Sequence, residues 1–210
     1  MRRPRLLPTV LALALLAPVA TRAAVTFTTT FKSLDAGGTT FFGKKVAALV
    51  ITEDDSLRVA GEESLVRELK LRGVPGVASY RIAPKEELRH PETAKPWFEK
   101  AGVEGLIAVR PVTAESTVTY TPATWVSTNY STLWGYYGYG WGAVYVPGSR
   151  QRETVVVVET TLYSVPRNQL LWATVSESRN PDDLRGFVQE LMKESVKEMQ
   201  KQGLARKQVR

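Results

Sequence analysis

"RETVVVVETTLYSVPRNQLLWATVSES", residues 152–178, decides the fold of this chain. Its first half, "RETVVVVETTLYSV", is the strongest strand signal in the sequence, because it is dominated by β-branched and aromatic residues. The segment "PRNQ", 166–169, has the Pro and Asn of a tight turn, and "LLWATVSES" returns as a second strand. The stretch therefore predicts a β-hairpin.

Three further strands are predicted upstream of this hairpin. The runs "KKVAALVIT" (44–52), "GVASYRIAP" (76–84) and "GLIAVRPV" (105–112) are short and mostly apolar, as buried strands are. Helical segments separate them. Strands that alternate with helices at this spacing favour crossover connections and a sheet with parallel pairs.

The ends of the helices between these strands also have sequence signals. The first helix is expected to begin where Asp54, Asp55 or Ser56 accepts hydrogen bonds from free backbone N–H groups, and to end at Gly73. The second helical stretch is weaker and more polar, and Pro96 is suited to its first turn.

An amphipathic helix is predicted from Pro181 to a stop at Gly203. Its apolar face consists of Leu184, Phe187, Val188, Leu191, Met192, Val196 and Met199. The predicted fold is an α/β (α+β) domain with a single mixed β-sheet in the order βαβαβββα, covered by helices. A long, aromatic, glycine-rich hairpin insert separates the third strand from the final hairpin.

The first residues predict export. Residues 1–23 combine early arginines, an apolar stretch of about 15 residues and small residues up to Ala23, which is the pattern of a secretory signal peptide. The remaining parts are an extended N-terminal arm (24–43), a single α/β domain (44–204) containing the insert 116–149, and a basic disordered tail (205–210). We expect cleavage near Ala23 and a location in the periplasm or at the outer-membrane periphery.

Charge and cysteine content narrow the choice of partners. The net charge of +7 falls to +3 without the four arginines of residues 1–23, and much of the remaining excess lies in residues 201–210. The body is close to neutral and no segment interleaves basic with aromatic residues, so nucleic acid is not an expected partner. Because the sequence contains no Cys, we expect neither a disulfide nor a lipid on an N-terminal cysteine.

The segment from Ser116 to Ser149 has no charged residue over 34 positions, and it holds most of the Tyr residues. One interpretation is a long loop that packs on itself. The other is an exposed aromatic surface, since Tyr and Trp offer large, stiff contact areas to protein, sugar or membrane. In that case the binding residues are Tyr120, Trp125, Tyr130, Trp134, Tyr136, Tyr137, Tyr139, Trp141 and Tyr145.

Three features occur together: the opening "KKVAALVIT", the strand "GVEGLIAVRPV", and "VVVVETTLYSVPRNQLLWATVSES" before a C-terminal helix. With them, residues 40–204 resemble a family of poorly characterised bacterial cell-envelope proteins, many of them classed as lipoproteins, which carry a Tyr/Gly/Trp-rich insert. More distantly, the order of elements is similar to a periplasmic domain of three protein classes. These are the N-terminal domain of the Tol–Pal translocation protein, outer-membrane activators of peptidoglycan synthases, and the curli secretion channel. The resemblance implies an envelope protein without the lipobox Cys, and it transfers no catalytic residue.

No catalytic, metal or cofactor motif is found, so we expect no cofactor. His90, the single histidine, precedes Pro91 in a polar context that is typical of a solvated loop. The adjacent acids Asp54 and Asp55 sit where they would cap a helix. A hydrolase of envelope glycan would have to use acids such as Glu53 and Glu159, and this is the least favoured function.

The sequence therefore predicts a non-enzymatic cell-envelope protein that acts as a binding or assembly module through its uncharged aromatic insert. The expected partner is an envelope protein or peptidoglycan (glycan), with a membrane surface as a further candidate. The alternative is an oligomeric export or pore component that inserts hairpins into the outer membrane, although Pro122 and Pro147 interrupt the alternation that such hairpins need.

Overall fold

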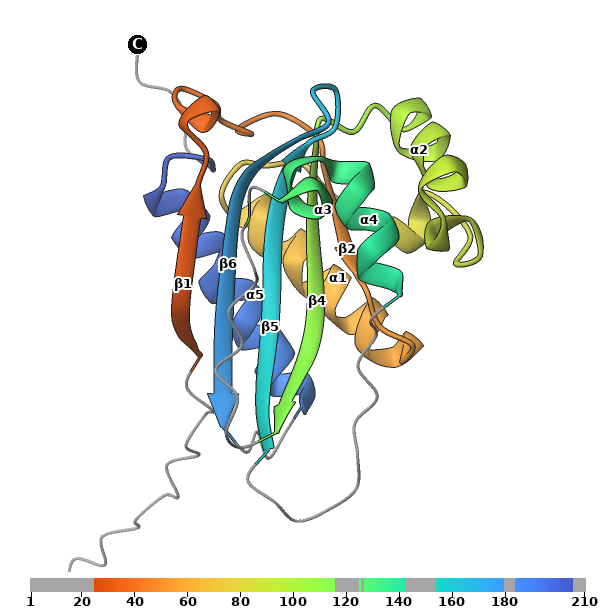
Figure 1. Ribbon diagram of the computed structural model, residues 1–210. Helices are drawn as coiled ribbons and strands as arrows, with labels where there is room; N and C mark the ends of the chain where they lie inside the picture. The colour runs from red at the N-terminus through yellow and green to blue at the C-terminus, as the bar shows by residue number, and fades with distance from the viewer. Residues whose placement is uncertain (1–24, 116–124, 126, 143–153, 180–183, 206–210) are drawn as a thin grey trace, which may run out of the picture.

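The computed structural model describes residues 25–115, 125, 127–142, 154–179 and 184–205. A six-stranded sheet in the order β1-β6-β5-β4-β2-β3 lies at the centre, with helices on both faces (Figure 1). The strands are β1 (Thr26–Lys32), β2 (Val46–Val50), β3 (Gly76–Ala78), β4 (Gly105–Glu115), β5 (Thr154–Ser164) and β6 (Gln169–Arg179). The helices are α1 (Asp55–Leu71), α2 (Pro91–Lys100), α3 (Thr128–Ser131), α4 (Leu133–Trp141) and α5 (Leu184–Lys201), with short 3-10 helices η1 (Leu34–Ala36), η2 (Ser79–Arg81) and η3 (Glu87–Arg89).

The predicted fold class is confirmed. From β2 to α5 the main elements follow the order βαβαβββα, with α3 and α4 inside the insert. The sheet is mixed, because β2 pairs in parallel with β3 and β4, whereas β4, β5 and β6 pair antiparallel in sequence. The region predicted as an extended arm supplies a further strand, β1, which pairs antiparallel with β6 and contains a bulge between Phe27 and Thr29.

Two apolar layers cover the two faces of the sheet. Helices α1 and α5 lie behind it in Figure 1, and α3 and α4 lie in front with α2 beside them. Successive residues of β5 point to opposite faces, so Val156 and Val158 pack in the α1/α5 layer while Val157 packs in the other layer. This explains why the valine run in this strand has no polar residue.

The start and end of α1 agree with the sequence signals. The Asp54 carboxylate caps the helix, accepting hydrogen bonds from the N–H groups of Ser56 (2.8 Å) and Leu57 (3.0 Å). Gly73 follows the helix with a φ of 75°, which a residue with a Cβ adopts only with strain.

Replacing Asp54 by Ala should lower the free energy of unfolding by about 1 kcal/mol, because two backbone N–H groups lose their acceptor. Urea unfolding followed by circular dichroism measures the effect. Asp54→Asn keeps an acceptor in the same place and should be nearly neutral. Equal losses in both variants would show that the cap is not the cause.

The strand predicted over 76–84 is shorter in the structure and ends at Ala78. Beyond Ala78, the buried carboxylate of Glu62 accepts hydrogen bonds from groups that a longer strand would pair with a neighbouring strand. It accepts hydrogen bonds from Val50 N (3.2 Å), Ser79 Oγ (2.6 Å) and Tyr80 N (3.1 Å). Burial raises the pKa of Glu62.

The prediction for Pro96 is wrong. Helix α2 begins at Pro91, which occupies its first turn, and Pro96 lies inside the helix. Pro91 fits its position because the first helical N–H groups have no acceptor within the helix.

The apolar face predicted for the C-terminal helix is confirmed, since Phe187, Leu191, Met192, Val196 and Met199 of α5 are buried. Leu184 and Val188 pack against the same core and are partly buried. Within the residues that the structure describes, no helix is long and apolar enough to span a membrane. The predicted signal peptide and residues 206–210 of the tail lie outside the described residues and stay predictions, whereas Ala205 is buried.

Candidate binding site

The described part of the aromatic insert is mostly helical. The insert joins the neighbouring antiparallel strands β4 and β5, as a hairpin connection does, but residues 128–141 form α3 and α4 across the front face of the sheet (Figure 1). Thr132 caps α4 by accepting a hydrogen bond from Gly135 N at 3.2 Å. The absence of a helical period in the sequence therefore did not mean the absence of a helix.

Glycines interrupt the apolar periodicity of α4, because they occupy positions where α4 approaches other elements. A Cβ on Gly140 would lie 2.9 Å from Cδ1 of Ile51, the residue after β2, and one on Gly138 would lie 3.3 Å from Pro91 Cγ on α2. These positions therefore favour glycine, so the apolar periodicity that usually marks a buried helix face is interrupted.

The nine residues predicted as a binding surface have different environments. Trp125, Tyr130, Tyr136 and Tyr137 are buried, Trp134 and Trp141 are half-buried, and Tyr139 is exposed. Tyr120 and Tyr145 lie outside the described residues. The structure thus brings seven of the nine onto one side of the sheet, but most of their ring area belongs to the core and only part of it faces outward.

The buried rings fix the insert to the sheet. Tyr136 stacks on Tyr163 of β5 with 5.7 Å between ring centroids, and Tyr137 meets Phe98 of α2 edge-on at 6.3 Å. Aromatic pairs in such arrangements add to the gain from burial itself. Burial also raises the pKa of Tyr136 and of Tyr137, so both phenols are neutral at physiological pH.

A buried ion pair lies beneath these rings. Arg110 on β4 and Glu159 on β5 stand opposite each other in the sheet, and Arg110 Nε donates to Glu159 Oε2 at 2.9 Å. The Tyr130 hydroxyl donates to Glu159 Oε1 at 3.0 Å, and Tyr163 donates to the Tyr130 carbonyl oxygen at 3.1 Å. The Arg110 guanidinium also lies 5.0 Å from the centroid of the Tyr139 ring. The pair therefore links two central strands to α3 and α4.

Sequence reasoning did not identify Arg110, and it considered Glu159 only as a hydrolase acid. A signal was present, since Arg110 is the one charge in the run "GLIAVRPV", Glu159 directly follows the run "VVVV", and the two charges are opposite. Unpaired burial of either would be costly, so complementary charges beside two such apolar runs indicate partners.

The acids of the hydrolase alternative belong to two different networks. Glu159 is fully buried and bonded as described, whereas Glu53 is exposed and pairs with Arg89 at 2.6 Å and with Lys85 at 3.8 Å. A glycosidase acid has to reach the sugar, which the bonded position of Glu159 does not favour.

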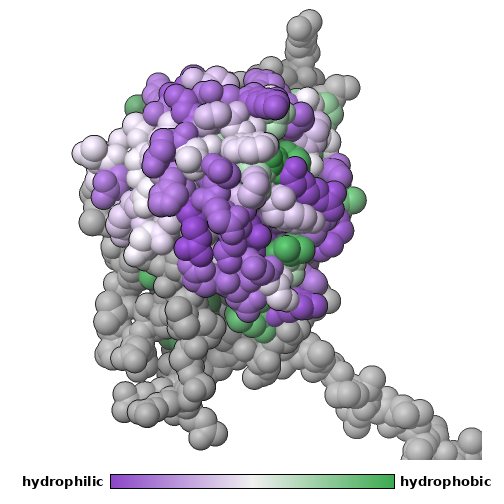
Figure 2. All heavy atoms as spheres, turned by 90° about the vertical axis from the view of Figure 1, so that its right-hand side faces the viewer, coloured by the Kyte–Doolittle hydropathy of each residue, from purple (hydrophilic) through white to green (hydrophobic). Residues whose placement is uncertain are grey.

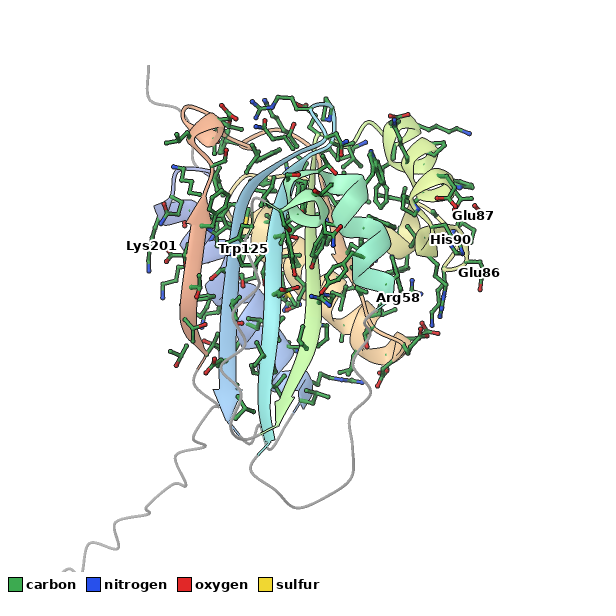
Figure 3. The ribbon with its side chains drawn as sticks, viewed as in Figure 1. Arg58, Glu86, Glu87, His90, Trp125 and Lys201 are labelled. Atoms are coloured by element: carbon green, nitrogen blue, oxygen red, sulfur yellow. The ribbon has the colours of Figure 1, made fainter. Side chains whose placement is uncertain are left out.

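His90 lies on the outer side of the molecule beside Glu86 and Glu87 (Figure 3). It is exposed, and its side chain makes no capping bond at the start of α2. Over the described residues, no group of three or more His, Cys, Asp or Glu side chains could hold a metal ion.

The side of α4 that faces away from the sheet carries aromatic rings and two glycines. At 100° per residue, Gly135 and Gly138 lie opposite the side buried on the sheet, with Tyr139 on one flank and Trp134 and Trp141 on the other. The flank with the two tryptophans adjoins α2, where Pro91 lies next to Gly138 and Phe98 next to Trp134. We call Trp134, Tyr139 and Trp141 the contact face. Figure 2 shows this front side of the molecule at its left, where it is paler and less hydrophilic than the charged centre.

The contact face borders cationic groups. The Arg89 guanidinium lies 5.7 Å from the centroid of the Trp141 ring, and Arg110 lies under Tyr139. Such cation–π contacts orient the rings without covering their outer edges. Aromatic rings in this arrangement can contact apolar or sugar-like surfaces.

No family model and no curated protein matches the chain. Among solved structures, it is similar to the PelC dodecamer from Paraburkholderia phytofirmans, with 14% identity over 89% of this chain and 99% of that one and a TM-score of 0.45. A substituted form of the same PelC gives 16% identity over 83% and 95% of the two chains and a TM-score of 0.44. Lipoprotein GNA1162 from Neisseria meningitidis gives 11% identity over 75% and 99% and a TM-score of 0.37. None of these likenesses identifies a family for the chain.

Proposed function

We propose that this chain is an exported, non-enzymatic cell-envelope protein that binds a partner through the contact face of the aromatic insert. The observation that supports the proposal is that buried side chains fix α4 to the sheet. Buried Tyr136 and Tyr137 fix the helix to the sheet, so Tyr139 is presented to solvent with 40% of its surface exposed. A rigid, preorganised aromatic surface loses little conformational entropy on binding.

The proposed location is the periplasm or the outer-membrane periphery, on the basis of the signal-peptide pattern in residues 1–23. The proposed partner is peptidoglycan or another envelope protein. Both offer surfaces that aromatic edges bind well, namely the C–H faces of sugar rings and the apolar centre of a protein interface.

Co-sedimentation of the exported form with purified peptidoglycan tests the glycan partner. We expect Tyr139→Ala to weaken binding by about tenfold, as loss of a central aromatic contact does. Trp97→Ala is the matched control, because Trp97 on α2 has a similar exposed fraction, 38%, but does not belong to the contact face. Equal weakening in both variants would reject the contact face. Failure of the unsubstituted protein to pellet would reject peptidoglycan and leave an envelope protein as the partner.

A further inference from the structure

A pocket of about 40 Å³ lies between the sheet and the layer formed by α1 and α5. One side of it is formed by β2, β4 and β5. The other side is formed by the first turns of the two helices, at Leu57 on α1 and from Leu184 to Met192 on α5. In Figure 1 both helices begin at the lower end of the sheet, so the pocket lies at that end.

The wall of the pocket is apolar. In the described part of the chain, Thr52 is the only residue with a polar side chain that lines it. The sheet contributes the small side chains of Val50, Val109, Val156 and Val158. Larger aliphatic side chains at these positions would fill more of the space, and protein cores rarely keep a void larger than a water molecule. Packing within the domain therefore does not explain why the space is left.

The pocket is closed on one side and open on another. A Cβ on Gly61 would lie 3.0 Å from Val50 Cγ2 and 3.2 Å from Val188 Cγ1, so α1 approaches β2 and α5 closely there. Leu57 and Leu184, nearer the starts of the helices, are only partly buried. The pocket therefore opens to solvent between the first turns of α1 and α5.

The apolar wall and the small size select a class of ligand. Water would bind poorly, because a buried water needs two or more polar partners and the wall offers only the Thr52 hydroxyl. A peptide group or a sugar would lose its hydrogen bonds inside. The pocket is also far smaller than the sites of drug-sized molecules, which have about 300–1,000 Å³. It therefore suits the end of a hydrocarbon chain.

The groups beside the opening do not favour one charge on a ligand. Arg185 Nη2 donates to Ser56 Oγ at 2.9 Å, and the Asp54 carboxylate accepts from Ser56 N at 2.8 Å. The next acid, Asp55, pairs with Lys85 at 2.8 Å. Because cations and anions stand side by side here, their effects on a charged group at the opening oppose each other. Recognition would rest on the hydrocarbon chain and not on the head group.

We propose that this pocket binds the end of the hydrocarbon chain of a single-chain amphiphile, whose head group stays in solvent. The chain end lies against the valines of the sheet and against Met192 of α5. The pocket is on the opposite face of the sheet from α4. The proposal is therefore independent of the contact face and of the partner proposed for it.

Two methionines of α5 make a direct test possible. Met192 lines the pocket, whereas Met199, about two turns later, is fully buried and does not line it. The protein is isotope-labelled at its methionine methyl groups and mixed with decanoate or with decyl maltoside, each below the concentration at which it forms micelles. We expect nuclear Overhauser effects from the terminal methyl group of either chain to the Met192 methyl group and none to that of Met199. Acetate, which has no chain, should shift neither signal.

Variants test the pocket itself. Val109→Ile combined with Val156→Ile adds two methyl groups inside it, so we expect decanoate to bind about tenfold more weakly. Val112→Ile is the matched control, because Val112 on β4 packs in the other layer, and it should leave decanoate binding unchanged. Tyr139→Ala should also leave it unchanged.

Several results would overturn the proposal. These are Overhauser effects to both methionines or to neither, effects from only one of the two amphiphiles, and undiminished binding by the double variant. None of them bears on the contact face, which is tested separately by peptidoglycan binding.

Discussion

Replacing Arg110 by Met is expected to lower the free energy of unfolding by about 3–5 kcal/mol. Arg110 is 2% exposed and its partner Glu159 is fully buried, so the substitution leaves a carboxylate without its positive partner and away from water. The Tyr130 hydroxyl would still donate to that carboxylate, but it brings no positive charge. Urea unfolding at neutral pH, followed by tryptophan fluorescence, measures the loss.

The double variant Arg110→Met with Glu159→Gln is the matched control. It removes both charges and keeps an acceptor for the Tyr130 hydroxyl, so it should recover much of the lost stability. If the single variant lost less than about 1 kcal/mol, the pair would not be a buried anchor of the insert.

Replacing Tyr137 by Ala is expected to cost about 3–5 kcal/mol as well, because a fully buried ring is removed and a cavity remains. The ring packs against Phe98 of α2 and, at a centroid distance of 5.6 Å, against Trp134. The loss should appear as a shift of one cooperative unfolding transition, since α4 belongs to the core of the domain.

Tyr139→Ala provides the contrast two residues along the same helix. Its ring is 40% exposed and contacts Arg110 and Tyr130, so the free energy of unfolding should fall by only about 1 kcal/mol. If Tyr137→Ala were equally mild, the insert would not be part of the core, and the rigidity on which the proposed function rests would be lost.

The strands could be predicted because their sequences satisfy local and global requirements together. The hairpin around "PRNQ" has strong strand formers on both sides of a turn, and Asn168 has the positive φ, 49°, that such turns use. Asp54 and Gly73 are local signals for the ends of α1, and both act as predicted. In these places the chain needs no distant contact to choose its structure.

The helix of the insert could not be predicted, because its stability comes from distant contacts. Gly135, Gly138 and Gly140 each disfavour an isolated helix by about 1 kcal/mol relative to Ala. Burial of Tyr136 and Tyr137 against the sheet and α2 offsets this, and no local pattern shows those contacts. The sequence singled out the insert as unusual without showing which of its rings would be buried.

The ion pair could not be predicted for the same reason. Arg110 and Glu159 become neighbours through the register of β4 against β5, which neither strand reveals alone.

The most direct test of the proposed function is photo-crosslinking in living cells from position 139. A benzophenone amino acid replaces Tyr139 in one strain and Trp97 in another, and both proteins are irradiated in the cells and recovered. We expect a discrete adduct with an envelope component from position 139 and none from position 97. Adducts from position 97 alone, or from neither position, would contradict the proposal that the contact face of the insert is the binding surface.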